Sequence, residues 1–444
     1  MKKVVVVGLG RSGVDSARLL AGRGDVVFIT EIKDTPATRA TAGELIKEGI
    51  VEQGNVELGR HTERFMKDSD LIVVSPGVKL AEHKGIPIIS ELELAYSMCP
   101  APIIAVTGTS GKTTVATLIG QMLVSSGRDA IVCGNIGNPL SGEIKRIKKD
   151  SIVVVEVSSF QLERIKDFRP KTSVILNISE NHLDRHKDME EYVSAKLRIF
   201  SNQNGTDVLF LNGKDRLLRK ISSQSRCRVE FFDEYKDFKK RYNIENEDFL
   251  AAMSVSSSEG VSEDVMLKVI SEFKGIEHRL EYVSTIDGVD FINDSKATTV
   301  SSVEWALQSL DEKIILIVGG RYKGGDFSSL KDLVNKKVNY IIAIGEARPQ
   351  IKKGLAGTKE IFEEEDLKGA VRTAFEKANK GDKILLSPGC SSFDMFKNYE
   401  ERGRVFKEII LSLRGRRRRP KQSQKEIASL RPALSKERAG LRSQ

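Results

Sequence analysis

The feature that most constrains the fold is a series of short aliphatic runs, each ending in glycine or polar residues. Helix-length amphipathic stretches separate these strand-length runs. Continuous apolar strands are buried on both faces, which is typical of parallel sheets covered by helices. The runs span Lys2–Gly8, Ile103–Gly108, Ile152–Ser159, Thr172–Ser179, Lys313–Gly320, Asn339–Gly345 and Lys383–Gly389. The pattern therefore predicts an α/β protein built on parallel sheets.

The strand–helix pattern restarts twice along the 444 residues, which predicts three domains followed by a tail. We place the domains at 1–98, 99–277 and 278–413. In the third, Asp287-Gly288 lies between two short strand patterns and predicts a hairpin. The segment 414–444 has no aromatic residue and no sustained apolar periodicity, so we expect it to be mostly disordered.

The basic charge of the chain is concentrated in this tail. The net charge is +9 and the pI is about 9.1, which on their own suggest a nucleic-acid partner. Positions 1–413 carry equal numbers of basic and acidic residues, however, so the charge indicates nothing about the ligand of the body. The tail could give weak, salt-sensitive binding of anions or be a solvated end. We favour the solvated end and expect no specific nucleic acid.

The remaining global features point to a soluble protein of the reducing cytosol. The 4 cysteines are scattered without C-x-x-C spacing, which favours free thiols over a disulfide or zinc framework. The N-terminal apolar run is short and interrupted by glycine, unlike a signal peptide. No stretch approaches the roughly 18 apolar residues of a membrane-spanning helix. We therefore expect a cytoplasmic protein without a membrane span.

A glycine-rich loop, Gly8–Gly13, follows the first aliphatic run and opens a helix pattern. Glycines at such a junction let backbone amides approach a phosphate at a helix N-terminus. Glu31 lies about 20 residues further on, where an acid can accept a hydrogen bond from a ribose. Alone, this motif is compatible with a dinucleotide-dependent oxidoreductase, with another nucleotide diphosphate, or with a plain strand-to-helix turn.

A second loop is the stronger signal for a nucleotide. It reads TGTSGKTT and keeps the GKT end of a P-loop, but Val106 stands where the standard pattern has its first glycine. Its glycines permit a tight anion-binding turn, Lys112 can neutralise phosphate charge, and a threonine hydroxyl can bind Mg²⁺. We therefore predict an ATP site at Gly108, Thr109, Ser110, Gly111, Lys112, Thr113 and Thr114.

Three charged residues further along are candidates for metal chemistry. Glu156 ends a buried strand pattern, where a carboxylate needs a partner such as a metal ion. His182 lies among acids in ISENHLDRH, a composition that suits Mg²⁺ or phosphate chemistry but also a solvated loop. Lys196 stands among apolar neighbours in a helix pattern, and by spacing alone it is most simply a snorkelling side chain.

Three polar or glycine-rich loops follow strand patterns in the third domain. They span Phe291–Thr299, Gly319–Phe327 and Ser387–Gly403. Each by itself could be a loop with helix-capping residues. Because the carboxyl ends of parallel strands meet at one edge of a sheet, the three together predict a ligand crevice there.

Taken together, these stretches resemble the Mur ligase family of ATP-dependent amide-forming enzymes. That family carries T-G-T-[NS]-G-K-T in place of the standard P-loop, which accounts for Val106. Matching pieces follow in order over about positions 1–412, and Ser387–Gly403 resembles in particular the members that add D-glutamate. The resemblance implies an N-terminal Rossmann-like domain that binds UDP, a central P-loop ATPase-like parallel sheet, and a C-terminal Rossmann-like open sheet that binds the amino acid.

The same resemblance assigns residues to substrates. It implies contacts with the UDP-sugar at Arg11, Ser12, Glu31, Lys33, Ser75, Pro76, Gly77 and Asn135. To the ATP loop it adds Asn243, Asn246, Arg279, Asp294 and Lys296. It implies D-glutamate contacts at Thr298, Lys323, Ser392, Phe393 and Tyr399. It implies metal ligands at Thr113, Glu156, His182 and Lys196 (as a carbamate), and catalytic roles for Lys112, Lys196 and His182.

The implied reaction joins D-glutamate to UDP-N-acetylmuramoyl-L-alanine through an acyl phosphate, with ATP and Mg²⁺ or Mn²⁺, in peptidoglycan precursor synthesis. We expect a monomer. A sister ligase or a folylpolyglutamate synthase would share the ATPase domain, but the N-terminal glycine loop and Ser387–Gly403 favour the D-glutamate branch. An NAD-dependent oxidoreductase would leave the GKTT loop without a role.

Overall fold

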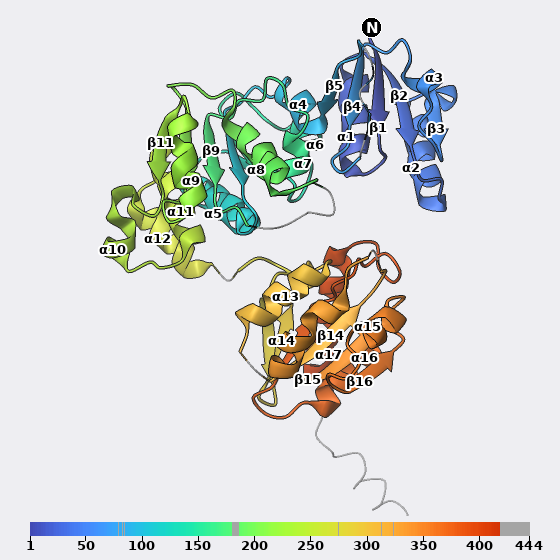
Figure 1. Ribbon diagram of the computed structural model, residues 1–444, viewed down its shortest axis with the longest axis vertical. Helices are drawn as coiled ribbons and strands as arrows, with labels where there is room; N and C mark the ends of the chain where they lie inside the picture. Colours follow the sequence, from blue (N-terminus) through green and yellow to red (C-terminus); the bar gives the residue numbers. More distant parts are fainter. Residues whose placement is uncertain are drawn as a thin grey trace, which may run out of the picture. The chain divides into compact units, whose positions relative to one another are not determined.

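The computed structural model describes residues 1–417 except 79, 82, 84, 180–185, 274, 312 and 323. The chain divides into two compact units, 1–273 and 274–444, and each is described by itself. In Figure 1 the first unit runs from blue to yellow and contains two sheets, whereas the second, in orange and red, contains one.

The N-terminal sheet is parallel throughout, with the strand order β3-β2-β1-β4-β5. Its central strand β1 (Lys3–Val7) is a run of valines that is fully buried from Val4 onward, as expected for a strand covered on both faces. The other strands are β2 (Val26–Glu31), β3 (Val56–Leu58), β4 (Leu71–Val74) and β5 (Ile88–Ser90). The helices are α1 (Arg11–Gly22), α2 (Pro36–Lys47), η1 (Gln53–Asn55), α3 (Glu63–Met66) and α4 (Glu91–Tyr96).

The central sheet is also parallel, with the order β11-β10-β9-β6-β8-β7. Strands β6 (Ile103–Thr107) and β8 (Ile152–Glu156) are buried along their whole length and pair near its centre. Their carboxyl ends, Thr107 and Glu156, therefore emerge next to each other. The remaining strands are β7 (Ala130–Gly134), β9 (Thr172–Ile175), β10 (Val208–Leu211) and β11 (Arg228–Phe231).

Helix α5 (Lys112–Ser125) is deeply buried against this sheet, and it packs with α11 (Glu247–Ser258) in one apolar cluster. Its first residue follows the glycine loop directly, so the loop is held between a buried strand and a buried helix. The other helices are α6 (Leu140–Glu143), α7 (Ser159–Leu162), α8 (Met189–Leu197), η2 (Arg198–Phe200), α9 (Arg216–Ile221), η3 (Ser222–Gln224), η4 (Tyr235–Asp237), α10 (Phe238–Tyr242) and α12 (Glu263–Glu272).

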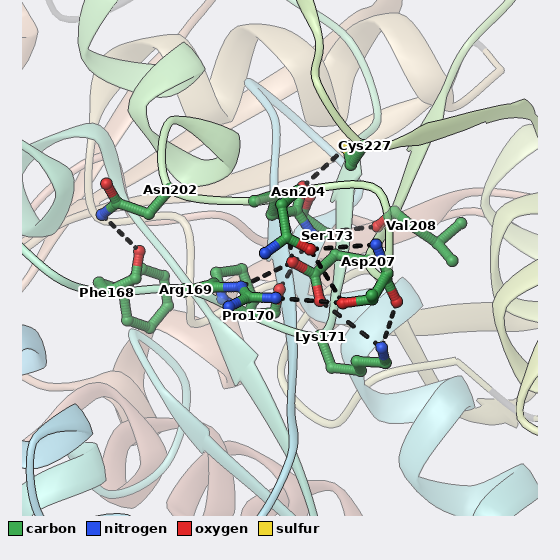
Figure 2. A network of polar contacts seen from close by, with 12 residues as sticks. Phe168, Arg169, Pro170, Lys171, Ser173, Asn202, Asn204, Asp207, Val208 and Cys227 are labelled. Carbon is green, nitrogen blue, oxygen red and sulfur yellow. Dashed lines mark hydrogen bonds and ion pairs between the residues drawn. The ribbon is translucent and has the colours of Figure 1, made fainter.

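A polar network anchors the opposite edge of the central sheet, where β9 and β10 begin (Figure 2). The buried carboxylate of Asp207 accepts hydrogen bonds from Arg169 Nε at 2.7 Å and from the Asn204 amide at 3.0 Å. Lys171 Nζ lies 3.6 Å from the same carboxylate. These partners lower the pKa of Asp207 despite its burial. The network fixes the turn ahead of β10, at the amino-terminal ends of these strands, and does not involve residues at their carboxyl ends.

The sheet of the second unit is mixed, with the order β12-β13-β17-β14-β15-β16. Strand β12 (Glu281–Ile286) is antiparallel; it forms the predicted hairpin with β13 (Val289–Asn293), and Asp287 and Gly288 adopt positive φ angles of 53° and 81° between them. The parallel strands are β14 (Ile314–Gly319), β15 (Val338–Ile344), β16 (Ile361–Glu364) and β17 (Lys383–Leu386). The helices are α13 (Val300–Ser309), η5 (Phe327–Leu330), α14 (Lys331–Lys337), α15 (Arg348–Gly354), α16 (Leu367–Lys377) and α17 (Tyr399–Arg417).

The predicted fold class is confirmed: three helix-covered sheets, of which two are parallel and the third is open and mixed. Helix α17 continues to Arg417, a short way into the segment predicted to be mostly disordered. Arginine is a good helix former, so a basic composition does not stop a helix that packing has already started. The rest of the predicted tail lies outside the described residues. Among those that are described, no helix combines the length and apolarity needed to cross a membrane.

Candidate active site

The loop between β6 and α5 is a tight turn that only glycine can complete. Gly111, the residue before α5, has φ of +80°, and a Cβ there would lie 2.3 Å from Oδ1 of Asp248. Thr109 and Ser110 direct their amides to one side-chain oxygen, Oδ1 of Asn177, at 3.1 and 2.9 Å. A loop with glycine at its narrowest point and a helix N-terminus behind it has the form of a phosphate-binding site.

Lys112 lies over this loop. Its Nζ donates to the carbonyl oxygens of Gly108 at 2.9 Å and Thr109 at 3.0 Å. The predicted phosphate-neutralising ammonium is therefore at the loop it was assigned to. Thr114, the other predicted loop residue, follows in the first turn of α5.

The carboxylate of Glu156 joins two other predicted residues. It is 2% exposed, and it accepts hydrogen bonds from the Thr113 hydroxyl at 2.8 Å and from Asn135 Nδ2 at 2.7 Å. Thr113 comes from the helix after the loop, whereas Asn135 follows β7, the neighbour of β8. Three residues predicted from separate motifs thus meet in one cluster, in which Glu156 and Thr113 are buried and Asn135 is exposed.

Lys196, from α8, reaches the same loop. Its side chain is 2% exposed, and Nζ donates to the Gly108 carbonyl at 2.8 Å, the oxygen that Lys112 also contacts. Burial, together with the positive charge of Lys112, lowers the pKa of Lys196 to about 7, although Glu156 acts in the other direction. The snorkelling interpretation is wrong here, since the ammonium points into the site and not to solvent.

Two residues that the sequence analysis did not single out complete this cluster. Asn177 follows β9 and holds the loop amides described above. Tyr192 lies one turn before Lys196 on α8; its ring lies 4.7 Å from Lys196 Nζ, and its hydroxyl contacts Thr109 Oγ1 at 3.1 Å. Both had a signal: Asn177 is a polar residue just after a buried strand, and Tyr192 shares a helix face with Lys196 through i, i+4 spacing.

The two asparagines predicted to contact ATP, Asn243 and Asn246, lie just before the start of α11. Asn243 ends α10 with φ of +51°, and Asn246 caps α11 by accepting from the Phe249 amide at 3.2 Å. Because Asp248 of the same helix approaches Gly111, the start of α11 lies beside the loop. Both asparagines thus precede a helix whose start lies beside the loop, and their contact with ATP stays a prediction.

The N-terminal glycine loop is packed closely against the end of β4. A Cβ on Gly13 would lie 1.8 Å from the Gly8 carbonyl oxygen, and Ser75 Oγ donates to that oxygen at 3.2 Å. Pro76 and Gly77 continue from Ser75, and Arg11 and Ser12 open α1. Five of the residues predicted to contact the UDP-sugar therefore lie around one turn, and the contact itself stays a prediction.

Glu31 ends β2, and its carboxylate serves this loop. Oε2 accepts from the Leu9 amide at 2.8 Å, and Oε1 accepts from the Lys33 amide at 2.9 Å. Glu31 therefore holds the glycine loop in shape, a role that the sequence analysis did not predict. Its predicted contact with a nucleotide stays a prediction.

In the second unit, the predicted residues gather at the carboxyl ends of β13 and β17, which pair in parallel. Asp294 follows β13; its carboxylate is 3% exposed and accepts from Ser387 Oγ at 2.7 Å and from the Leu280 amide at 3.2 Å. Burial raises its pKa to about 7. Lys296 follows, and its amide donates to the His278 carbonyl at 3.0 Å.

The other predicted contacts of this unit differ in exposure. The guanidinium of Arg279 lies 5.4 Å from the Trp305 ring. Thr298 is half-buried, Ser392 is buried and Phe393 is exposed. Tyr399 opens α17 and meets the His278 ring edge-on, with 6.4 Å between ring centroids. His182 and Lys323 lie outside the described residues.

The first unit offers oxygen ligands rather than a preformed metal cage. Among the described residues, no group of three or more His, Cys, Asp and Glu side chains is placed to hold a metal. The Thr113 hydroxyl and the Glu156 carboxylate nevertheless lie together beside the loop. Such a partial oxygen set fits Mg²⁺, which usually takes one or two carboxylates and completes its shell with phosphates and water.

Comparisons with known proteins cover the whole body of the chain. Three family models match it in order: "Mur ligase MurD-like, N-terminal domain" at 2–90, "Mur ligase middle domain" at 106–275 and "Mur ligase, glutamate ligase domain" at 278–390. A UDP-N-acetylmuramoylalanine–D-glutamate ligase of Koribacter versatilis is 38% identical over 92% of this chain and 97% of its own length. A protein with the same description from Caldanaerobacter subterraneus is 40% identical, over 93% and 99%.

A solved structure supports the fold independently of close sequence similarity. The UDP-N-acetylmuramate–alanine ligase of Thermotoga maritima aligns over 93% of this chain and 100% of its own, with a TM-score of 0.56 at 19% identity. The predicted resemblance is confirmed by the family matches and by the full-length relatives. The chain belongs to the Mur ligase family.

Proposed function

We propose that this chain joins D-glutamate to UDP-N-acetylmuramoyl-L-alanine at the expense of ATP, in the cytoplasm, where peptidoglycan precursors are assembled. The observation that carries the proposal is the 38% identity over 92% of the chain to a relative described as that ligase. A sister ligase is less well supported, because the N-terminal match is to the MurD-like type of domain. An NAD-dependent oxidoreductase would leave the Lys112 loop unused.

The reaction has two steps, each of which brings anions together. The terminal carboxylate of the nucleotide sugar attacks the γ-phosphorus of ATP, ADP leaves, and an acyl phosphate forms. The neutral amine of D-glutamate then attacks the acyl carbonyl, and phosphate leaves with the electrons of the C–O bond while the amine loses its proton. The protein's task is to position these groups and to neutralise their repulsion.

The first unit supplies the groups for the phosphoryl step. Lys112, held over the loop by the Gly108 and Thr109 carbonyls, neutralises the phosphates. The amides in the first turn of α5 would bind phosphate oxygens, whereas those of Thr109 and Ser110 are held by Asn177. We assign Asn135, which donates to Glu156, to the nucleotide sugar.

Thr113 and Glu156, with His182, would hold Mg²⁺, which supplies positive charge to the phosphates and the developing acyl phosphate. In the described structure the Thr113 hydroxyl donates to Glu156 at 2.8 Å, so the two oxygens that would hold the cation already lie together. The discrimination between Mg²⁺ and Mn²⁺ does not follow from these oxygens.

We also propose that Lys196 is carbamylated. The ammonium first loses one proton; the neutral amine then attacks CO₂, forms an N–C bond and loses a second proton, so that a cation becomes an anion. Burial and Lys112 lower the pKa of Lys196 to about 7, so the reactive neutral form is available near neutral pH. The carbamate would relieve the repulsion between the two ammoniums that share the Gly108 carbonyl and would offer oxygens to the cation.

In the second unit, the remaining contacts are assigned to a residue ahead of β12 and to the segments that follow β13, β14 and β17. We assign Arg279, Asp294 and Lys296 to ATP, and Thr298, Lys323, Ser392, Phe393 and Tyr399 to D-glutamate. A lysine paired with a substrate carboxylate gives a charge-assisted hydrogen bond, which suits the role given to Lys323.

The test is phosphate release by the full chain with ATP, Mg²⁺ and UDP-N-acetylmuramoyl-L-alanine. D-glutamate, L-glutamate, L-lysine or no amino acid is added in parallel. Release that requires both the nucleotide sugar and D-glutamate supports the proposal. Release with L-lysine instead would show a ligase of the same family with a different amino-acid substrate. Release without any amino acid would show only an ATPase activity.

A further inference from the structure

The largest wholly buried side chain among the described residues is that of Arg402, in the first turn of α17. Arginine is almost never fully buried unless its charge and donors are satisfied. Burial lowers its pKa to about 10, so the guanidinium remains a cation at neutral pH. A cation kept at this depth needs a reason beyond the packing of a helix.

The donors of Arg402 reach two different loops. Nε donates to Ser295 Oγ at 3.0 Å and Nη2 to the Ser295 carbonyl at 2.8 Å. Nη1 donates to the Cys390 carbonyl at 3.2 Å. These acceptors are neutral oxygens, so the contacts specify position rather than form an ion pair. The planar fork of a guanidinium is suited to hold two backbones at one spacing.

These two loops carry the residues assigned to the two ligands of this unit. Ser295 lies between Asp294 and Lys296, the predicted ATP contacts. Cys390 lies two residues before Ser392, a predicted D-glutamate contact. Because β13 and β17 pair in parallel, with Asn293 opposite Leu386, both loops leave the same edge of the sheet.

Other contacts also couple the same loops, each through a single hydrogen bond. The Gly389 amide donates to the Ala297 carbonyl at 2.9 Å, and Ser387 Oγ donates to Asp294 at 2.7 Å. Ser295 Oγ also donates to the Tyr399 carbonyl at 2.8 Å, which ties the first loop to the start of α17. Arg402 differs from these contacts because it touches both loops through one rigid group.

We propose that Arg402 is a positioning residue of the ligation reaction. Its guanidinium fixes the Ser295 loop against the Cys390 loop, so that the phosphate-side and amino-acid-side contacts are presented at one spacing. This inference rests on the proposed function for its kinetic consequence, but the coupling of the loops is a property of the protein without ligands.

The first experiment measures the coupling itself, by hydrogen exchange in the ligand-free full chain. Arg402→Lys keeps the charge and the long side chain but cannot bond both loops. Phe406→Leu is the matched control, because Phe406 is a fully buried residue one turn further along α17. We expect faster exchange at the amides of Lys296 and Gly389 in Arg402→Lys than in Phe406→Leu at equal thermal stability. Equal exchange in the two variants would overturn the proposal.

The second experiment measures kinetics in the same variants. We expect Arg402→Lys to raise KM for D-glutamate by about tenfold, since small displacements of contact residues are costly, while Phe406→Leu leaves KM unchanged. Loss of stability alone lowers the amount of active enzyme and does not move KM. An unchanged KM in Arg402→Lys would also refute the positioning role. Wild-type protein without D-glutamate-dependent turnover would refute the proposed function instead, and the exchange result would still decide the coupling.

Discussion

Replacing Lys196 tests the chemistry of the loop most directly. An arginine in its place would keep a positive charge, but a guanidinium is never neutral at working pH and does not form the carbamate. If the lysine acts only as a cation on the Gly108 carbonyl, Lys196→Arg should retain much of the activity. If it acts as a carbamate, we expect the variant to lose at least about 100-fold in kcat, a loss typical of a missing group at a reacting phosphate.

The size of the pKa shift of Lys196 makes carbamylation feasible near neutral pH. The pKa of Lys196 is lowered from 10.5 to about 7. At pH 7 an ordinary lysine is neutral in only about one molecule in three thousand, whereas Lys196 is neutral in about half. Burial and Lys112 therefore enrich the form that reacts with CO₂ by about three orders of magnitude.

The assay combines turnover with direct detection. Protein is equilibrated with ¹³C-bicarbonate, and a carbamate carbon signal is sought by NMR in the wild type, in Lys196→Arg and in Lys187→Arg. Lys187 is exposed and lies in the same stretch of sequence, so it is the matched control. Below pH 7 the amine is protonated, so both the signal and the activity should fall as the pH is lowered. A wild type without the labelled carbon, or an active Lys196→Arg, would refute the reasoning.

Three further predictions test neighbouring parts of the molecule. Gly111→Ala should cost about 1–3 kcal/mol of stability and weaken ATP binding in calorimetry, because φ is +80° and Asp248 is 2.3 Å from the new Cβ. Gly127 has a similar φ of +85° but no atom near the position of a Cβ, so Gly127→Ala should lower stability without weakening ATP binding. Glu156→Gln should raise the Mg²⁺ concentration needed for half-maximal phosphate release, with exposed Glu190→Gln as a control that leaves it unchanged. The pKa of Asp294 is raised to about 7 in the folded state, so its neutral form stabilises the fold fully below the unfolded-state pKa, and this stability is lost as the pH rises through about 7. Between pH 5 and 7.5 the free energy of unfolding of the wild type should therefore fall by about 2–3 kcal/mol relative to Asp294→Asn, as measured by urea unfolding. An equal pH response of the two proteins would contradict this assignment.

The architecture could be predicted because its signals are local. The valines of β1 and the apolar run of β6 are strand-length and buried on both faces, and their helices follow at once. Asp287-Gly288 specified its hairpin for the same reason, since two positive φ angles are a property of those two residues. The end of α17 at Arg417 is not a local signal of this kind, because where a basic helix stops depends on the packing of its earlier turns.

The residues of the site could be recognised from the chemistry of short motifs. How they come together depends on the tertiary fold, which the motifs do not specify. Nothing in the spacing of Lys112 and Lys196 predicts that both ammoniums meet the Gly108 carbonyl, because α8 is far from the loop along the chain. The lowered pKa of Lys196 is a consequence of its burial at that meeting point. Asn177 was passed over because a lone asparagine after a strand is common, and its value comes from the two loop amides whose hydrogen bonds it accepts.

Two carboxylates predicted as ligand contacts illustrate why residue type does not settle role. Glu31 and Glu156 both end a strand of a parallel sheet beside a glycine loop. Glu31 accepts hydrogen bonds from the backbone amides of Leu9 and Lys33, so both oxygens of its carboxylate stabilise the turn. Within the described part of the chain, the carboxylate of Glu156 accepts from the side chains of Thr113 and Asn135, which can rotate away when a cation arrives. Donors that belong to the backbone cannot be exchanged without unfolding the turn, whereas side-chain donors can. Exchangeable side-chain partners are therefore compatible with the metal-binding role proposed for Glu156, whereas the backbone partners of Glu31 give it a structural role in the turn.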